Sequence, residues 1–233
     1  MSEPLNKRRA ILAVACVVLC FGVIAIETTV WKGQRYYLTS LIIVVLSMLP
    51  FFIRFESSKP QAKELVLLAV MTALAVAGRE AFYWLPQFKP VCAIAILTAI
   101  AFDPSSGFIC GASAGLISNF FMGQGPWTPW QMLGFGLVAF LGGVIFHGRE
   151  VKTVPLLIYG FFSVLILYGV LLDTASLLMA TSSPTWKGLI AMCASGFWFN
   201  VIHAAATVVF LWLLKKPLLT KLERVKVKYG IFE

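Results

Sequence analysis

Long runs of apolar residues without a formal charge follow one another along almost the whole chain. A helix that spans a membrane needs roughly 20 mostly apolar residues, so these runs predict an all-α, polytopic transmembrane helix bundle. The longest run, after Pro90, is interrupted by turn-forming residues at 103–107 and at 123–129. The eight predicted helices cover residues 10–26, 36–53, 65–85, 91–102, 108–121, 130–146, 154–172 and 188–214.

The first predicted helix resembles a signal peptide, because a basic cluster precedes an apolar segment. Apolar sequence continues after Cys20, Phe21 and Gly22, where a signal peptide would carry a cleavage site with small residues. We therefore interpret residues 10–26 as a retained helix.

The composition supports a membrane protein. Of the 233 residues, 60% are hydrophobic and only 12% are charged, and the mean hydropathy is +0.89. Soluble domains have about 25% charged residues, so soluble enzymes, secreted disulfide domains and disordered chains are excluded. The five cysteines all lie in predicted helices without CxxC spacing, which favours buried packing over a metal site or a disulfide framework.

The distribution of basic residues predicts the orientation. If the N-terminus is inside, 14 of the 19 Lys and Arg residues are cytoplasmic and five are outside. Cytoplasmic loops are enriched in these residues, so the bias predicts that both termini are cytoplasmic. The outside set is Lys32, Arg35, Arg79, Lys89 and Lys187.

No motif indicates an enzyme. The chain has no GxxxxGK[ST] phosphate-binding loop and no HExxH motif. Ser195 and His203 are eight residues apart on one predicted helix, about 12 Å along its axis, and so cannot form a nucleophile–base pair. The small residues from Gly111 to Gly115 favour close helix packing over a nucleophile elbow.

Two predicted outer loops combine aromatic rings, amides and prolines, and a third, longer loop is expected from Asp173 to Trp186. Aromatic faces with a few amides suit a pocket for an organic ligand, whereas an aromatic belt at the lipid headgroups is the alternative. The amides favour the pocket, because a belt does not need them. The candidate ligand residues in the first two loops are Tyr83, Trp84, Phe88, Lys89, Gln124, Trp127, Trp130 and Gln131.

Polar side chains within the predicted helices add further candidates, because such residues are costly in a membrane. Arg79 lies near the outer end of the third helix, where its side chain could snorkel to the headgroups. Asn119 lies near the outer end of the fifth, and Asn200 and His203 share one face of the last helix. If the ligand carries a phosphate, Arg79 or Lys89 could pair with it, but each could instead interact with Glu80 or with lipid headgroups. We expect Asn119, Asn200 and His203 to line the pocket floor. We expect His203 to bond a neighbouring group and not a metal.

The third helix carries Ala69, Ala73 and Ala77 at four-residue spacing. Small residues at this spacing form a flat stripe that another helix can approach closely. Internal packing explains one such pair, but two successive repeats favour a subunit interface.

These features together resemble the substrate-binding S components of energy-coupling factor (ECF) vitamin transporters. The alanine stripe matches the AxxxA stripe with which that family docks on its coupling subunit, and the six predicted helices from Leu65 onward match its core. The run from Phe88 to Gln131 resembles the cobalamin-specific, CbrT-like branch.

The resemblance implies a division of the chain into residues 1–63 with two additional helices, a six-helix core at 64–216, and a basic cytoplasmic tail at 217–233. It implies high-affinity binding of cobalamin or related corrinoids as transported substrate, with no catalytic cofactor. The implied partners are the coupling subunit EcfT and two ABC ATPases, EcfA and EcfA', in a bacterial plasma membrane. The alternatives are another vitamin or a queuosine precursor as ligand, or an intramembrane enzyme or structural membrane protein.

Overall fold

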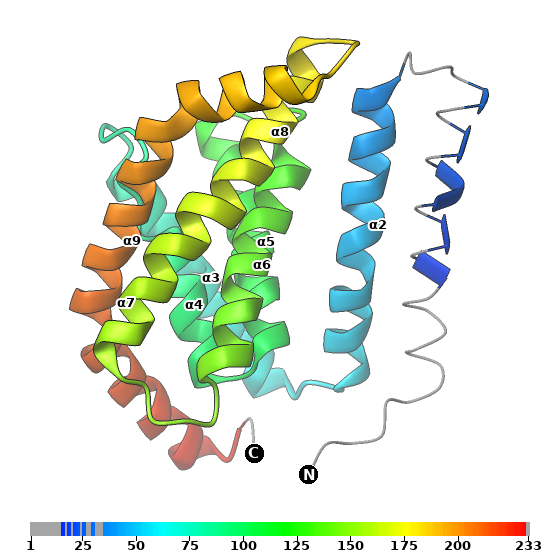
Figure 1. Cartoon of the computed structure of the whole chain (residues 1–233). Coiled ribbons are helices and arrows are strands. Elements are labelled where there is room, and N and C mark those ends of the chain that lie inside the picture. The colour runs from blue at the N-terminus through cyan, green and yellow to red at the C-terminus, as the bar shows by residue number, and fades with distance from the viewer. Residues whose placement is uncertain are drawn as a thin grey trace.

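The computed structural model describes residues 35–231 and, before them, residues 15–16, 18–19, 21–23, 25–26 and 29–30. Every regular element in this part of the chain is helical, which confirms the predicted fold class (Figure 1). Residues 10–14, 17, 20 and 24 of the first predicted helix, and the basic cluster before it, lie outside the described residues. The elements are α2 (Tyr36–Ser57), α3 (Ala62–Ala81), α4 (Val91–Ala101), α5 (Pro104–Met122), α6 (Thr128–Phe146), α7 (Thr153–Phe162), the π-helical η1 (Ser163–Tyr168), α8 (Gly169–Ala180) and α9 (Trp186–Tyr229).

α4 is the centre of the bundle. All 11 of its residues are buried, because α3, α5, α6 and α9 pack around it. Its length of about 16 Å is too short to cross a hydrocarbon core of roughly 30 Å. The helix predicted at 91–102 is present, but it is too short to be a full membrane span by itself. The apolar run has a different cause, since a helix buried on every side is apolar all round.

Close contacts between backbones hold α4, α5 and α6 together. A Cβ atom on Gly111 would lie 2.6 Å from the carbonyl oxygen of Phe135, and one on Gly107 would lie 2.7 Å from the Cα of Ala99. Only glycine fits at such distances. The structure thus confirms that the small residues of the GASAG run serve helix packing.

α5 begins earlier than the sequence pattern predicts, at Pro104 and not at Phe108. Asp103 caps this helix, because its carboxylate accepts hydrogen bonds from the backbone N–H groups of Ser105 at 2.7 Å and Ser106 at 3.2 Å. Proline suits the first helical turn, where its missing N–H has no helical partner. The turn-forming residues at 103–107 therefore start a helix as well as ending α4.

The prediction of a long outer loop from Asp173 to Trp186 is wrong. α7, η1 and α8 form one continuous helix from Thr153 to Ala180, and the connection to α9 is only residues 181–185. Asp173 accepts a hydrogen bond from Asn200 Nδ2 on α9 at 2.9 Å. A Cβ on Gly196 would lie 2.5 Å from the Asp173 carboxylate, so this glycine makes room for it.

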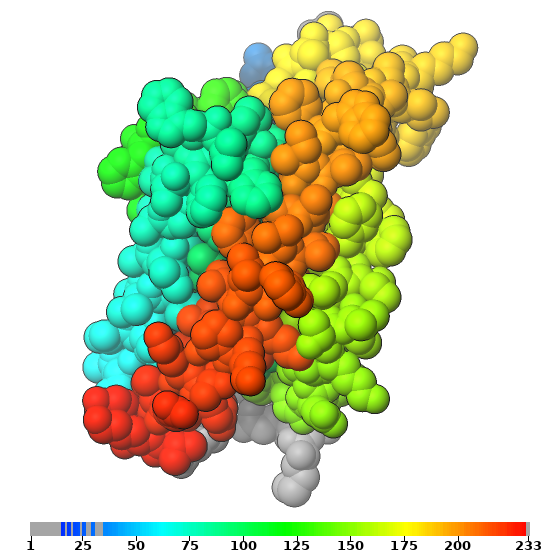
Figure 2. Space-filling model, turned by 90° about the vertical axis from the view of Figure 1, so that its left-hand side faces the viewer, coloured from blue at the N-terminus to red at the C-terminus, as the bar shows by residue number. Residues whose placement is uncertain are grey.

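α9 continues through Pro217 to Tyr229, so much of the predicted basic tail is helical. Figure 2 shows α9 crossing one face obliquely, with its C-terminal part (red) next to the start of α3 (cyan). There Lys63 Nζ donates to the carbonyl oxygen of Tyr229 at 3.4 Å. Lys226 Nζ donates to the carbonyl oxygen of Ala101 at 2.9 Å, which ties α9 to the end of α4.

α2 packs beside the bundle against α5, α6 and α8 (Figure 1). Its Phe51 ring stacks on Phe108 of α5 with centroids 4.0 Å apart. Near its other end, the Tyr37 hydroxyl donates to the carbonyl oxygen of Pro126 at 2.9 Å. α2 therefore contacts the core at both ends, and one contact reaches the connection between α5 and α6.

The two ends of the bundle differ in chemistry. The basic end comprises the connections at 58–61 and 147–152 and α9 from Lys215 onward; the aromatic end comprises the connections at 82–90, 123–127 and 181–185. Four helices of the described chain are long and apolar enough to cross a membrane, namely α2, α6, the continuous helix 153–180 and α9. α3 and α5 have 20 and 19 residues, but α3 carries charged residues near both ends and α5 is rich in glycine and serine.

Candidate functional site

A cavity of about 210 Å³ opens at the aromatic end, above the start of α4. Its wall comes from α3, α4, α5, α6, η1, α9 and the connection between α3 and α4, so six helices and one loop converge on it. The lining residues are Arg79, Tyr83, Pro86, Gln87, Lys89, Val91, Met122, Gln131, Phe135, Tyr168 and His203.

Arg79 is the most unusual residue of this wall. Its side chain is only 8% exposed, and its Nη1 donates to Ser118 Oγ and, at 2.9 Å, to Asn119 Oδ1. The guanidinium carbon also lies 5.5 Å from the ring centroid of Phe135, a cation–π contact. The side chain therefore points into the bundle, and the expected snorkelling to the headgroups is wrong.

Asn119 transmits the orientation of Arg79 to Gln131. Because Asn119 Oδ1 accepts from Arg79, its Nδ2 group is left to donate, and it does so to Gln131 Oε1 at 2.8 Å and Thr128 Oγ1 at 2.9 Å. Thr128 in turn donates to Gln124 Oε1 at 2.9 Å. This bond turns Gln131 Oε1 toward Asn119 and leaves the N–H groups of the amide to donate elsewhere.

His203 also lines the cavity and lies near Phe135, with ring centroids 6.1 Å apart. Its ring is 2% exposed and contacts Tyr168 edge-on, with centroids 4.9 Å apart. Its Nε2 lies 3.7 Å from the Cys92 sulfur, whereas its buried Nδ1 has no hydrogen-bond partner within the described chain. A buried polar atom without a partner is costly, so this nitrogen indicates an unfilled interaction beside the cavity.

Lys89 is a second buried cation beside the cavity. Its Nζ donates to the carbonyl oxygen of Phe82 and lies 6.0 Å from the Tyr83 ring centroid. Burial, and after it the positive charge of Arg79, lower the pKa of Lys89. The two cations are thus close enough to affect each other.

The structure brings five of the twelve predicted ligand residues to the cavity wall: Arg79, Tyr83, Lys89, Gln131 and His203. Asn119 and Gln124 lie behind the wall in the hydrogen-bond network. The other five face elsewhere. Trp84 is 87% exposed, and Phe88 packs on Phe82 and Phe210. Trp127 lies against Gly125, and Trp130 is buried in a second hydrophobic cluster with Val44 and Met48. Asn200 forms a hydrogen bond with Asp173.

Sequence reasoning missed Phe135 and Tyr168, whose rings stack with centroids 4.8 Å apart in the cavity wall. Both lie within apolar runs, where nothing in the pattern distinguishes a ring that faces a cavity from one that faces a neighbouring helix. Tyr168 ends the π-helical segment η1, and such segments are frequent at functional sites.

A separate groove of about 640 Å³ runs along α3, between it and α5, with Phe55 of α2 at one side. Ala69, Ala73 and Ala77 are exposed along it. The stripe is therefore at the surface, and internal packing within this chain does not account for it. Glu80 lies in the same groove, with its Oε1 buried and without a partner in the described chain.

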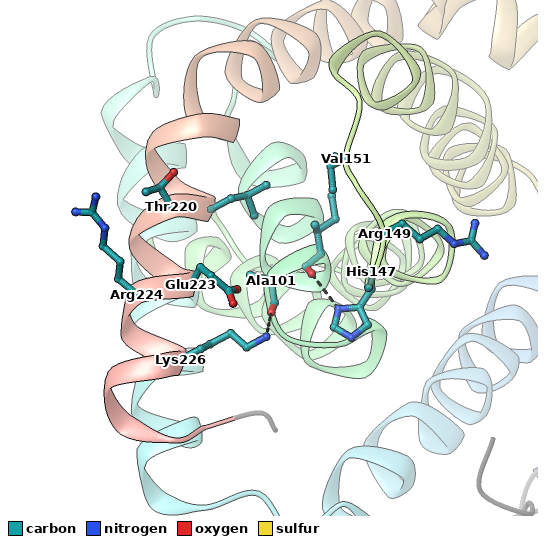
Figure 3. Close-up of a pocket in the computed structure, with 11 residues that line it drawn as sticks. Ala101, His147, Arg149, Val151, Thr220, Glu223, Arg224 and Lys226 are labelled. Atoms are coloured by element: carbon teal, nitrogen blue, oxygen red, sulfur yellow. Dashed lines mark hydrogen bonds between the residues drawn. The ribbon is translucent and has the colours of Figure 1, made fainter. Parts of the chain in front are cut away.

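The basic end carries a larger groove of about 690 Å³, shown in Figure 3. Two inward-pointing side chains already bind backbone carbonyl oxygens at the end of α4: Lys226 binds Ala101, and His147 Nδ1 lies 2.9 Å from the oxygen of Ile100. Arg149 and Arg224 point away from the centre of the groove (Figure 3). These contacts cap α4 and fasten α9, so the cavity at the aromatic end is the better candidate for a ligand site.

Comparison with known proteins gives matches to a family of transporter components. Residues 59–219 match the family model described as "ECF-type riboflavin transporter, S component". Over 88 residues the chain is 32% identical to a UPF0397 protein of Vibrio atlanticus and 31% identical to UPF0397 proteins of Aliivibrio fischeri and Aliivibrio salmonicida. The matched region covers 36% of this chain and 48% of each relative, so the chain spans about half the length of the curated relatives it matches. No solved structure gives a significant match.

Proposed function

The chain belongs to the family of ECF-type riboflavin transporter S components, and on this premise we propose that its cavity at the aromatic end captures a vitamin for import. The observation that carries the proposal is that one cavity wall contains both the buried Arg79 and His203, whose Nδ1 has no partner among the described residues. Burying polar groups without full pairing costs stability, and a ligand that bonds to them would offset this cost.

The charge distribution supports an orientation with the cavity outward. The basic residues at 54–63, 149–152 and 215–228 lie at one end of the bundle, and the cavity lies at the other. The positive-inside rule then orients the basic end and both termini toward the cytoplasm.

Labelling would test this orientation. Ser183 lies exposed in the short connection between α8 and α9. A Ser183→Cys variant, made without the native cysteines, should react with a membrane-impermeant maleimide added to intact cells. Reaction only after the membrane is opened would reverse the proposed orientation.

We propose cobalamin as the first candidate ligand, on the resemblance of residues 88–131 to the cobalamin branch. A cavity of about 210 Å³ is smaller than the roughly 300–1,000 Å³ of pockets that enclose drug-sized ligands. A corrinoid would therefore insert one arm and lie across the rim, where Tyr83 and Trp84 are exposed. Riboflavin is the second candidate, because the description of the matching family names it.

Calorimetric titration of the detergent-purified protein with cobalamin, riboflavin, thiamine and biotin distinguishes these ligands. Micromolar or tighter binding of cobalamin alone supports the first candidate, and binding of riboflavin alone supports the second. If none of the four vitamins binds, the proposal that the protein captures one of them is contradicted.

The proposed partners follow from the family and the groove on α3. We propose that the coupling subunit EcfT packs against Ala69, Ala73 and Ala77, because exposed small residues permit close helix approach. EcfA and EcfA' would supply ATP hydrolysis. Purification of the tagged chain from cells that contain these subunits should bring them along.

A further inference from the structure

The charged residues that line the cavity are both cations. Arg79 and Lys89 line it, and among the described residues of its wall none is acidic. Glu80 is the nearby acidic residue, and its negative charge acts on both Arg79 and Lys89. Its side chain lines the groove on α3 and does not line the cavity, so it does not occupy the space between the two cations. Both cations are buried, at 8% and 6% exposure, so water screens their positive charge only weakly.

The neutral groups in the wall also present hydrogen-bond donors. Gln131 carries two amide N–H donors, one of which interacts with the Tyr168 oxygen, so the other remains for a ligand. The Tyr168 hydroxyl carries an O–H donor of its own. If the Cys92 thiol donates to His203 Nε2, the imidazole proton resides on the unpartnered Nδ1, which is then a donor as well. A ligand group that fits such a wall must accept hydrogen bonds.

We infer that the ligand group that enters this cavity is an anion, a carboxylate or a phosphate, held between Arg79 and Lys89. The inference rests on the proposed function and names the chemical class of the group that this site selects. Arg79 binds Ser118 and Asn119 through Nη1 alone, so its Nε and Nη2 groups remain for a ligand. Planar guanidinium groups suit both carboxylates and phosphates.

The size of the cavity agrees with one inserted group. About 210 Å³ accommodates a carboxylate or phosphate with its neighbouring atoms but not a whole corrinoid. Cobalamin carries one phosphodiester and would place it here. Riboflavin has no anionic group, so the inference favours its 5'-phosphate over riboflavin itself.

The test compares ligands within pairs that differ in the anionic group: riboflavin 5'-phosphate and riboflavin, biotin and biotinamide, nicotinate and nicotinamide. Cobalamin and cobinamide form a fourth pair, in which the phosphate is lost together with the ribose and the dimethylbenzimidazole base, so a difference in this pair counts only if the cation variants below remove it. The riboflavin and cobalamin pairs test a phosphate and the other two a carboxylate. In the pair that the protein recognises, the anionic member should bind about 10–100-fold more tightly, as expected for a charge-assisted hydrogen bond. Equal binding of both members overturns the inference and leaves vitamin capture intact. If no ligand of any pair binds, both the inference and the proposed vitamin capture are overturned.

Variants assign the preference to the two cations. Lys89→Gln keeps a donor for the Phe82 carbonyl but removes the charge, and should reduce the anion preference at least about tenfold. Arg79→Gln should do the same, with its thermal midpoint measured to verify folding. Lys187→Gln is the matched control, because Lys187 is an exposed cation at the same end of the bundle and does not line the cavity. An unchanged preference in Lys89→Gln and in a folded Arg79→Gln overturns the assignment.

Discussion

Asn119 accepts from Arg79 with its oxygen and donates to Gln131 and Thr128 with its nitrogen. It is 1% exposed, so water cannot replace any of these bonds. The amide therefore has one orientation, and it fixes which end of the Gln131 side chain faces the ligand. The hydrogen-bonding character of the cavity depends on this residue even though Asn119 does not line it.

Replacement of Asn119 tests this role. In Asn119→Leu the buried N–H of Arg79 and the oxygen of Gln131 both lose a partner, at a cost of about 1–3 kcal/mol each in stability. Gln131 can then rotate, and we expect vitamin affinity to fall about tenfold or more. Asn200→Leu serves as the control, because it removes a similar bond to Asp173 away from the cavity. Equal losses of affinity in the two variants would mean that the effect is only one of stability.

At the scale of residues, the sequence indicates which side chains are unusual but not where they point. Arg79, Lys89 and His203 are predicted as ligand residues because polar groups in apolar helices require a reason, and all three line the cavity. Trp130 and Gln131 are adjacent in the same motif, yet Trp130 packs toward α2 while Gln131 faces the cavity. Their directions depend on the rotation of α6, which its uniformly apolar sequence does not specify.

At the scale of elements, α2 has a position that suggests a supporting role. No residue of α2 lines the cavity, although its Phe55 borders the groove on α3. α2 contacts the connection at 123–127 through the bond from Tyr37 to Pro126. This connection leads into α6, which carries Gln131 and Phe135. We expect α2 to restrict the motion of this side of the cavity.

The Tyr37→Phe variant removes the bond and leaves the ring. The expected loss of stability is about 0.5–1.5 kcal/mol, typical of one hydrogen bond, with a matching loss of affinity below about tenfold. Tyr36→Phe on the neighbouring residue is the control and should change neither quantity. Calorimetric titration with the recognised vitamin measures the affinity, and an unaltered Tyr37→Phe protein would show that α2 does not support the cavity.

The helix pattern could be predicted better than the helix ends. Charge-free runs locate α2, α3, α6 and α9 correctly, because lipid and a protein core both require apolar helices. Asp173 led to a wrong helix end, because a charged residue after an apolar run is typical of the start of a loop. In the structure Asp173 stays within the helix, since Asn200 and Gly196 accommodate its side chain between α8 and α9. The predicted end of the last helix at residue 214 is likewise too early, because α9 continues through Pro217 to Tyr229.

At the scale of the whole molecule, the cavity and the alanine groove are distinct surfaces joined by α3. Arg79 faces the cavity, whereas Ala69, Ala73 and Ala77 face the groove. Ligand binding and partner docking should therefore be separable by mutation, although both use the same helix.

The Ala73→Trp variant tests this separation. A bulky ring in the middle of the stripe prevents close helix approach, so assembly with the coupling subunit and uptake should fail. Ligand binding to the isolated protein should persist, because Ala73 is exposed in the groove and does not line the cavity. Co-purification measures assembly. Intact assembly in this variant would contradict docking on the stripe.

The central claim is that this chain captures a vitamin in the cavity that Arg79 lines. Cobalamin and riboflavin are both coloured, so an absorption spectrum of the protein purified from cells supplied with both vitamins tests the claim most directly. We expect the wild-type protein to carry the spectrum of one of them and the folded Arg79→Gln variant to lose most of it. A colourless wild-type protein, or a variant that is as strongly coloured as the wild type, would contradict the account.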